Sequence, residues 1–273
     1  MGIFRIAFIG GGNMGQAMAA AIIVKNLAAP GDVAVSDVSQ ARLDLLKKEL
    51  GVYTTVSNLE AASRGEIVVL AVKPQTLDGV MAELAGKLNP AQLVLSIVAG
   101  KSLATLRDGL KHQAIVRAMP NTPAQIGKGM TVWTATQDVT AAQRINVEAI
   151  LHVMGRAVYT GYESYLDLAT AVSGSGPAYV FLFMEALMAA AMEIGMPEEM
   201  ARILVFQTVL GSAEYAQQSG KELAELRHNV TSPGGTTAEA LKVFEQGDFS
   251  GLVKKAVAAA YKRARELGRN PKS

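Results

Sequence analysis

The sequence contains no cysteine, and this absence excludes several kinds of site at once. Disulfides, thiolate nucleophiles and cysteine-bound metals all require that side chain. Histidine is scarce too, because only His112, His152 and His228 occur, and no two of them are spaced as ligands on one helix face. We therefore expect no metal site.

Charged side chains are also few. They make up 18% of the 273 residues, the net charge is +2, and no run of Lys and Arg forms the patch that nucleic acids require. The longest apolar stretch, residues 178–192, contains Glu185 and is shorter than the roughly 20 apolar residues that span a membrane. The first apolar run, residues 6–9, is too short for a signal peptide. We expect a cytoplasmic protein without nucleic-acid or membrane partners.

The first part of the chain alternates short apolar runs with helical patterns. This alternation predicts an α/β fold for residues 1–161, and the glycine-rich segment near its start, Gly10 to Gly15, predicts that it is a Rossmann-like dinucleotide-binding domain. Helices are predicted at 14–27, from a cap at Ser39 to Gly51, from Asn58, at 77–88, and from a Thr140–Gln143 capping box to Met154. The predicted strands are residues 5–9, 32–36, 52–56, 66–72, 93–99, 114–119, 130–136 and 156–160.

The strand signal ends after Tyr162. Residues 162–273 are predicted to form an all-α domain, with a last helix from Phe249 to Leu267. An interruption at residues 173–177 is expected to be either a kink with Pro177 at the first helical position or a set of glycines that admits a ligand.

A glycine-rich segment follows the first predicted strand. Gly10, Gly12 and Gly15 fit the pattern G-x-G-x-x-G between a strand and a helix, and a second strand comes next. The dinucleotide fingerprint requires this context, because its glycines allow a tight turn, close approach of a pyrophosphate and helix–strand packing. The alternative is a glycine-rich turn that binds no ligand. The context favours nucleotide binding.

The end of the second strand bears on the choice of cofactor. Ser36 can donate a hydrogen bond to a 2′-phosphate, whereas Asp37 suits the ribose hydroxyls of NAD if it turns inward. Successive side chains of a strand point in opposite directions, and the sequence leaves open which of the two faces the ribose. Asp37 is equally consistent with a solvated residue before the helix that Ser39 caps.

Residues 229–237, Asn-Val-Thr-Ser-Pro-Gly-Gly-Thr-Thr, run from a proline–glycine turn into a helical pattern. Thr237, Leu241 and Phe244 are spaced i, i+4 and i+7, which predicts one apolar helix face that points into the core. The two glycines let a ligand approach the backbone, and the first N–H groups of a helix attract anions. This predicts a small-anion site beside the Thr237 hydroxyl. The alternative is an ordinary turn and helix cap.

Five segments together carry a resemblance to a known family. They are residues 8–15, 71–74 (Ala-Val-Lys-Pro), 119–123 (Met-Pro-Asn-Thr-Pro), 173–178 (Ser-Gly-Ser-Gly-Pro-Ala) and 229–237. In this order the chain resembles pyrroline-5-carboxylate reductases over essentially its whole length, and the last two segments are specific to that family. The family often has serine where this chain has Thr231, a change that keeps the hydroxyl.

The resemblance implies a helical dimerisation and substrate domain at 162–273, a homodimer or larger assembly, and NADPH as cofactor with NADH as the alternative. Substrate contacts are implied for Asn229, Ser232, Gly234, Gly235, Thr236 and Thr237. Cofactor contacts are implied for Gly10, Gly12, Asn13, Met14, Ser36, Asn58, Ala71, Val72, Lys73, Pro74, Ala99 and Gly100.

The implied reaction reduces the cyclic imine 1-pyrroline-5-carboxylate to L-proline, the last step of proline biosynthesis. We expect Thr237 to be the catalytic residue, with its hydroxyl bonded to the ring nitrogen while the turn holds the carboxylate. Lys73 suits cofactor contact better than proton donation. Two alternatives are a reductase of another small imine or keto acid and a nucleotide-binding protein without turnover.

Overall fold

The computed structural model describes residues 4–268, which form two compact units. The first contains residues 4–175 and 260–268, and the second contains residues 176–259. Residues 1–3 and 269–273, at the outer ends of the two predicted domains, lie outside the described residues. The predicted boundary after residue 161 stays a prediction.

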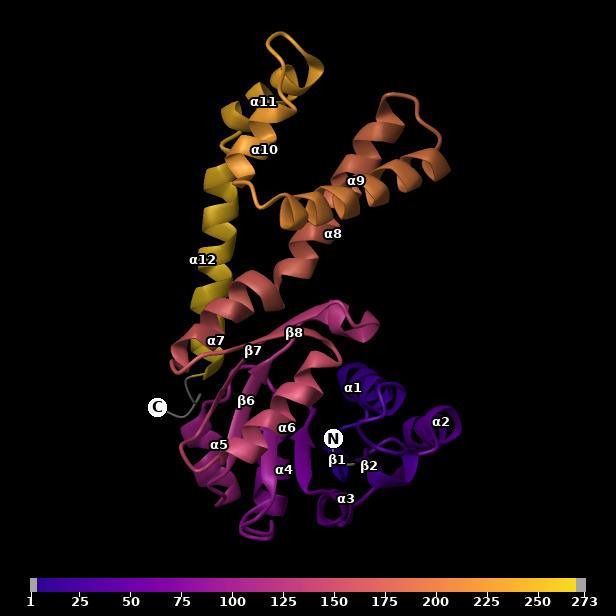
Figure 1. Ribbon diagram of the computed structural model, residues 1–273, viewed down its shortest axis with the longest axis vertical. Coiled ribbons are helices and arrows are strands. Elements are labelled where there is room, and N and C mark those ends of the chain that lie inside the picture. The colour runs from indigo at the N-terminus through magenta and orange to yellow at the C-terminus, as the bar shows by residue number, and fades with distance from the viewer. Residues whose placement is uncertain (1–3, 269–273) are drawn as a thin grey trace. The chain divides into compact units, whose positions relative to one another are not determined.

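An eight-stranded sheet forms the centre of the first unit (Figure 1). Its order is β3-β2-β1-β4-β5-β6-β7-β8, and the pairs from β3 to β6 are parallel. β7 runs antiparallel to β6, and β8 runs parallel to β7. The order reverses between β1 and β4, and ligands of such sheets bind beyond the carboxyl ends of the strands at that point. The strands are β1 Ile6–Ile9, β2 Val33–Ser36, β3 Tyr53–Thr55, β4 Ile67–Leu70, β5 Leu93–Ser96, β6 Ile115–Met119, β7 Gly129–Ala135 and β8 Gly155–Tyr159.

Helices cover both faces of this sheet, so strand residues are buried whichever way they point. Phe8 packs in one core with α1, α2 and α6, while its neighbour Ile9 packs in the other with α3, α4 and α5. This two-sided burial explains why the central strands are short continuous apolar runs. The helices are α1 Asn13–Val24, α2 Gln40–Leu50, α3 Asn58–Arg64, α4 Leu77–Leu84, α5 Leu103–Leu110 and α6 Ala141–His152, and 3-10 turns lie at Pro30–Asp32 and Thr122–Ile126.

The eight predicted strands and the five predicted helices of this unit are confirmed, mostly with shorter bounds. The Ser39 side chain caps α2, Gly51 ends it in a left-handed conformation, and Thr140 and Gln143 form the predicted capping box. Helix α5 was not among the predicted elements. It has only two buried residues, Leu106 and Leu110, which leaves a weak periodic signal in the sequence.

The remaining helices are α7 Ser164–Ala169, α8 Gly176–Glu193, α9 Glu198–Ser219, α10 Leu223–Asn229, α11 Thr236–Gln246 and α12 Phe249–Gly268. The predicted interruption is a π-helical stretch, Thr170–Gly174, between α7 and α8. Pro177 is the second residue of α8, one position later than predicted, where its missing N–H is still tolerated because a helix leaves its first N–H groups unpaired.

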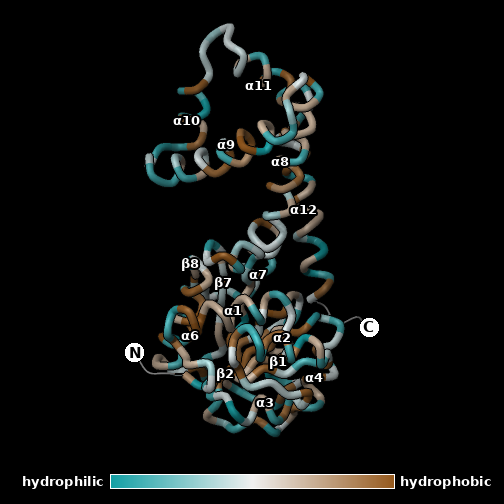
Figure 2. The backbone as a smooth tube through the Cα atoms, turned by 90° about the vertical axis from the view of Figure 1, so that its right-hand side faces the viewer, coloured by the Kyte–Doolittle hydropathy of each residue, from teal (hydrophilic) through white to brown (hydrophobic). Residues whose placement is uncertain are grey.

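The second unit leaves most of its apolar side chains exposed. Among residues 176–259 the buried ones are Ala201 and Val205, whereas Phe181, Phe206 and Leu210 are each more than half exposed. Brown, hydrophobic segments occur along both α8 and α9, interrupted by teal ones on α9 (Figure 2). An apolar surface of this extent marks an interaction site on a protein.

Candidate active site

The glycine loop between β1 and α1 has the geometry of a phosphate cradle. Gly10 has φ +106°, and an added Cβ would lie 2.8 Å from the backbone of Ala71. An added Cβ on Gly15 would lie 2.4 Å from the carbonyl oxygen of Gly10. Gly12 precedes α1 and faces open space, so a ligand can reach the free N–H groups of the helix. The three glycines therefore meet the three requirements of the dinucleotide fingerprint.

The other predicted cofactor residues lie at the same edge of the sheet. Ala71 to Pro74 follow β4, and Ala99 and Gly100 follow β5. Lys73 is exposed, and its carbonyl oxygen accepts hydrogen bonds from the Thr76 backbone and hydroxyl, each 3.0 Å long. Since β1, β2, β4 and β5 are neighbouring parallel strands, their carboxyl ends lie side by side at one edge of the sheet, where ligands of such sheets bind.

Ser36 and Asp37, at the end of β2, point to different partners. Ser36 is fully buried, and its hydroxyl donates to Asn58 Oδ1 at 2.8 Å. The Asp37 carboxylate accepts the Gly11 N–H at 2.8 Å and the Ser39 N–H at 2.9 Å. Asp37 is therefore the one that lies against the glycine loop.

Ion pairs that the sequence analysis missed hold the loop after β5. Lys101, which is buried, pairs with Asp78 in the first turn of α4 at 2.7 Å. Glu163 accepts the Leu103 N–H at 2.7 Å and also pairs with Arg117 at 3.0 Å. Long sequence separations leave no local signal for such pairs.

The predicted substrate segment begins with a tight turn. The Gly235 N–H donates to the Ser232 carbonyl at 3.0 Å, and Gly234 between them has φ +72°. A proline at the second position and a glycine with positive φ at the third define a type II turn. An added Cβ on Gly235 would lie 2.4 Å from Ser232 Oγ, so the hydroxyl sits directly over that glycine.

Helix α11 starts immediately after this turn, with Gly235 at the N-cap position. Thr236 and Thr237 are thus its first two residues, and the cap has no side-chain hydrogen bond. The first N–H groups of an α-helix have no partner within the helix and attract anions. Asn229, the last residue of α10, is exposed at the other end of the segment.

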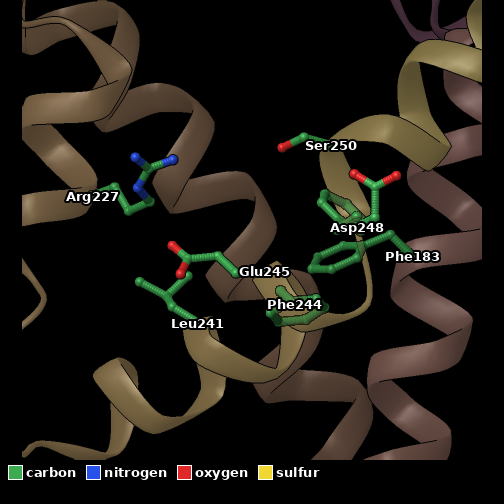
Figure 3. Close-up of a pocket in the computed structure, with 8 residues that line it drawn as sticks. Phe183, Arg227, Leu241, Phe244, Glu245, Asp248 and Ser250 are labelled. Atoms are coloured by element: carbon green, nitrogen blue, oxygen red, sulfur yellow. The ribbon is translucent and has the colours of Figure 1, made fainter.

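The prediction that the apolar face of α11 points into a core is wrong for the described chain. Leu241 and Phe244 instead line a cavity of about 580 Å³ with Phe183, Arg227 and Phe249 (Figure 3). Thr237 lies one turn before Leu241 and is only half-buried. The reason is that residues 176–259 supply too few apolar neighbours to close over this face.

Two of the segments that carried the resemblance meet in the first unit. The Asn121 side chain donates to Ser173 Oγ at 3.2 Å and accepts the Met130 N–H at 2.8 Å. This amide therefore joins the end of β6 to the π-helical stretch. Within residues 4–268 there is no group of three or more His, Cys, Asp or Glu side chains that could hold a metal ion.

The doubly wound sheet, the glycine loop at its carboxyl edge and the helices that follow define the class of protein, a dinucleotide-binding oxidoreductase with a second, helical part. Comparison with known proteins agrees. Residues 5–100 match the family model described as NADP oxidoreductase, coenzyme F420-dependent, and residues 163–267 match the pyrroline-5-carboxylate reductase dimerisation model.

A pyrroline-5-carboxylate reductase from Synechocystis is 43% identical over 97% of this chain and 98% of its own length. Solved pyrroline-5-carboxylate reductase structures from Coxiella burnetii and Plasmodium falciparum, the latter with NADP bound, give TM-scores of 0.88 and 0.89. Their identities are 38% and 32%, over 98% and 97% of this chain and 100% and 98% of their own. The chain belongs to the pyrroline-5-carboxylate reductase family, and its reaction converts pyrroline-5-carboxylate to proline.

One helical run in the described chain, Ser164–Glu193, is long and apolar enough to cross a membrane by length and composition alone, with a mean hydropathy of 1.4. The same residues fall inside the dimerisation match.

Proposed function

We propose that the carboxyl edge of the sheet binds NADPH, with NADH as the alternative. The support is the open, positively polarised N-terminus of α1 beside Gly12, and the NADP that the Plasmodium relative carries. The cofactor supplies a hydride when it is bound. The residues that would hold it are Gly10, Gly12, Asn13, Met14, Ser36, Asn58, Ala71, Val72, Lys73, Pro74, Ala99 and Gly100.

The substrate site we propose is the turn and helix start at residues 229–237. The carboxylate of the substrate would bind at the N-terminus of α11, where unpaired N–H groups provide hydrogen bonds and partial positive charge. Gly234 and Gly235 keep the approach free of side chains. Asn229, Ser232, Thr236 and Thr237 contribute polar groups around it. The observation that carries this proposal is the type II turn that ends at Gly235, the N-cap residue of α11.

Reduction of the imine adds a hydride to the ring carbon and a proton to the ring nitrogen. We propose that the Thr237 hydroxyl hydrogen-bonds that nitrogen and so fixes the orientation of the bound ring for hydride addition. A neutral hydroxyl is a weak acid, and the proton arrives either with a substrate that binds already protonated or from solvent. Positioning of the two reactants then provides most of the rate enhancement.

Substitution of Thr237 tests this role. Thr237→Ala and Thr237→Val should lower kcat/KM by up to roughly 10²–10⁴-fold, the range of general acid–base assistance. Thr237→Ser keeps the hydroxyl and is the matched control, with kcat/KM close to that of the wild type. Thermal melts of the three variants separate catalysis from helix stability. Wild-type kinetics in both the alanine and valine variants would remove Thr237 from the mechanism.

The choice of substrate has a direct assay. Oxidation of NADPH and of NADH is followed by absorbance with pyrroline-5-carboxylate, with a six-membered cyclic imino acid and with a small keto acid. The fastest turnover is expected with the five-membered imine. Faster turnover of either analogue would favour a different natural substrate, and cofactor binding without any turnover would favour a sensor.

We also propose a cytoplasmic homodimer or larger homo-oligomer. The support is the dimerisation match at residues 163–267 and the exposed apolar side chains of α8 and α9. Light scattering during size-exclusion chromatography should give at least twice the chain mass of 28.7 kDa. A monomer at micromolar concentration would contradict this assembly.

A further inference from the structure

Glu163 lies just before helix α7, yet within the described residues its side chain serves another helix. Its Oε1 accepts the N–H of Leu103, the first residue of α5, at 2.7 Å across 60 positions of the sequence. The first N–H groups of a helix have no partner within the helix, and a carboxylate is favourable beside them. Ser102 satisfies another of these groups by accepting the Thr105 N–H at 3.1 Å. Glu163 therefore completes the start of α5 from a distant part of the chain.

The loop that this bond closes belongs to the proposed cofactor site. Residues 97–102 connect β5 to α5, and they include Ala99 and Gly100. Strand β5 fixes one end of the loop, and the bond from α5 to Glu163 fixes the other. A loop that is already held in its binding conformation loses less entropy when a ligand binds, so its affinity for that ligand is higher.

The Glu163 carboxylate is itself held in place by a buried cation. Arg117 Nη1 donates to the same Oε1 at 3.0 Å, Nη2 donates to Asp167 Oδ1 at 3.0 Å, and the arginine side chain is 6% exposed. An acid fixed in this way is a pre-organised acceptor, whereas a free glutamate would lose rotamer freedom on forming the bond. One carboxylate oxygen thus joins the start of α5, strand β6 and the start of α7.

Helix α7 continues directly into the π-helical stretch Thr170–Gly174. Asn121 holds the far end of this stretch by donating to Ser173 Oγ at 3.2 Å. Single π-helical turns inside helices are rare and occur frequently at functional sites. Glu163 is also the first residue of the match to the dimerisation model. The cofactor loop is therefore bonded directly to the start of the segment that carries this stretch.

We propose that Glu163 is a positioning residue that holds residues 97–102 in the conformation that binds the cofactor, and that it links cofactor binding to helix α7 and the π-helical stretch. The inference rests on the proposed cofactor site and adds a residue outside it. Glu163 has no part in the proposed chemistry, so its loss should weaken cofactor binding and leave the chemical step intact. Coupling between two sites is reciprocal, so bound cofactor should in turn stabilise α7.

The first test measures binding of NADP⁺ to the full-length protein by calorimetry, without substrate. Glu163→Ala should raise the Kd at least tenfold, because a hydrogen bond to a charged group contributes roughly a factor of ten to a hundred to an equilibrium constant. Glu163→Gln keeps an oxygen acceptor for the Leu103 N–H and should recover most of the affinity. In steady-state assays, Glu163→Ala should raise the KM for NADPH and leave kcat unchanged.

Asp167→Ala is the matched control, because Asp167 pairs with the same guanidinium at the same 3.0 Å. Within the described chain, no hydrogen bond joins Asp167 to residues 97–103. Both alanine variants lose one ion pair of Arg117 and should lower Tm by comparable amounts, whereas only Glu163→Ala should weaken NADP⁺ binding. Equal increases of Kd in the two variants would show a general loss of stability and would overturn the inference. A wild-type Kd in Glu163→Ala would overturn it as well.

Amide hydrogen exchange tests the link to α7. Saturating NADP⁺ should slow exchange in residues 164–174 of the wild type, and this protection should be lost in Glu163→Ala at an NADP⁺ concentration that saturates the variant too. Equal protection in both proteins, or none in the wild type, would refute the link. A wild type that binds neither NADP⁺ nor NAD⁺ would instead refute the proposed function, and the inference with it.

Discussion

Removal of the Arg117 guanidinium is the sharpest test of how the first unit is held together. Arg117 lies on β6 with its side chain 6% exposed, and it pairs with Glu163 and with Asp167 of α7, each at 3.0 Å. Arg117→Met removes the charge and keeps much of the volume. Two carboxylates then remain near each other without a cation.

The magnitude follows from their exposure. Breaking a fully buried pair costs about 3–5 kcal/mol, because a charge is left without its partner. Here the acids are 31% and 22% exposed, so water compensates in part and we expect a loss of about 2–3 kcal/mol. For a unit of this size, that loss lowers Tm by about 5–10 °C.

Thermal unfolding is measured at neutral pH and one fixed protein concentration, since assembly also affects Tm. Arg107→Met is the control, because its pair with Asp108 is 45% and 70% exposed and should be worth less than about 1 kcal/mol. The triple variant Arg117→Met, Glu163→Gln, Asp167→Asn should recover more than half of the loss, because no charge stays unpaired. A Tm for Arg117→Met equal to that of the control would refute this account.

Two further predictions concern the same unit. Gly100→Ala should lower Tm and raise the KM for the cofactor several-fold. Gly100 has φ +75°, a conformation that costs an alanine about 1–2 kcal/mol, and the new Cβ would lie 2.9 Å from Leu267 Cβ. Wild-type values would contradict it. Two hydrogen bonds, the stronger from Thr55 and the other from Tyr53, lower the pKa of Glu60 below its ordinary 4.5. The ionised acid therefore stabilises the fold above pH 4.5. This contribution to stability is lost as the pH falls through the lowered pKa. An NMR titration of Glu60 should give a higher pKa in the Tyr53→Phe variant than in the wild type, and an unchanged pKa would refute the effect of the Tyr53 hydrogen bond.

Much of the first unit could be predicted because its signals are local. Apolar runs of strand length, glycines after them and caps such as Thr140 each fix a boundary within a few residues. The antiparallel direction of β7 has no such signal, because a strand pattern is the same in both directions. Helix α5 was missed since its buried face consists of only two leucines.

The candidate site was predictable in composition but not in orientation. Strand alternation predicts that the side chains of Ser36 and Asp37 point in opposite directions. Only the structure shows that Asp37 faces the glycine loop, where it accepts the Gly11 N–H, while Ser36 donates to Asn58. For α11, periodicity found the apolar face correctly, but the inference that a core covers it failed. A periodic pattern identifies a face that can be buried, and the rest of the chain, or another copy, decides what covers it.

The chain leaves the first unit at residue 175 and returns to it at residue 260, so the helical unit is an insertion rather than an appendage. The returning turn of α12 places Leu267 against Gly100, at the loop proposed to hold the cofactor. A fragment cut after residue 161 therefore lacks a piece of its own nucleotide-binding body. Isolating that body requires residues 260–268 as well, and a truncation that removes Leu267 should weaken cofactor binding.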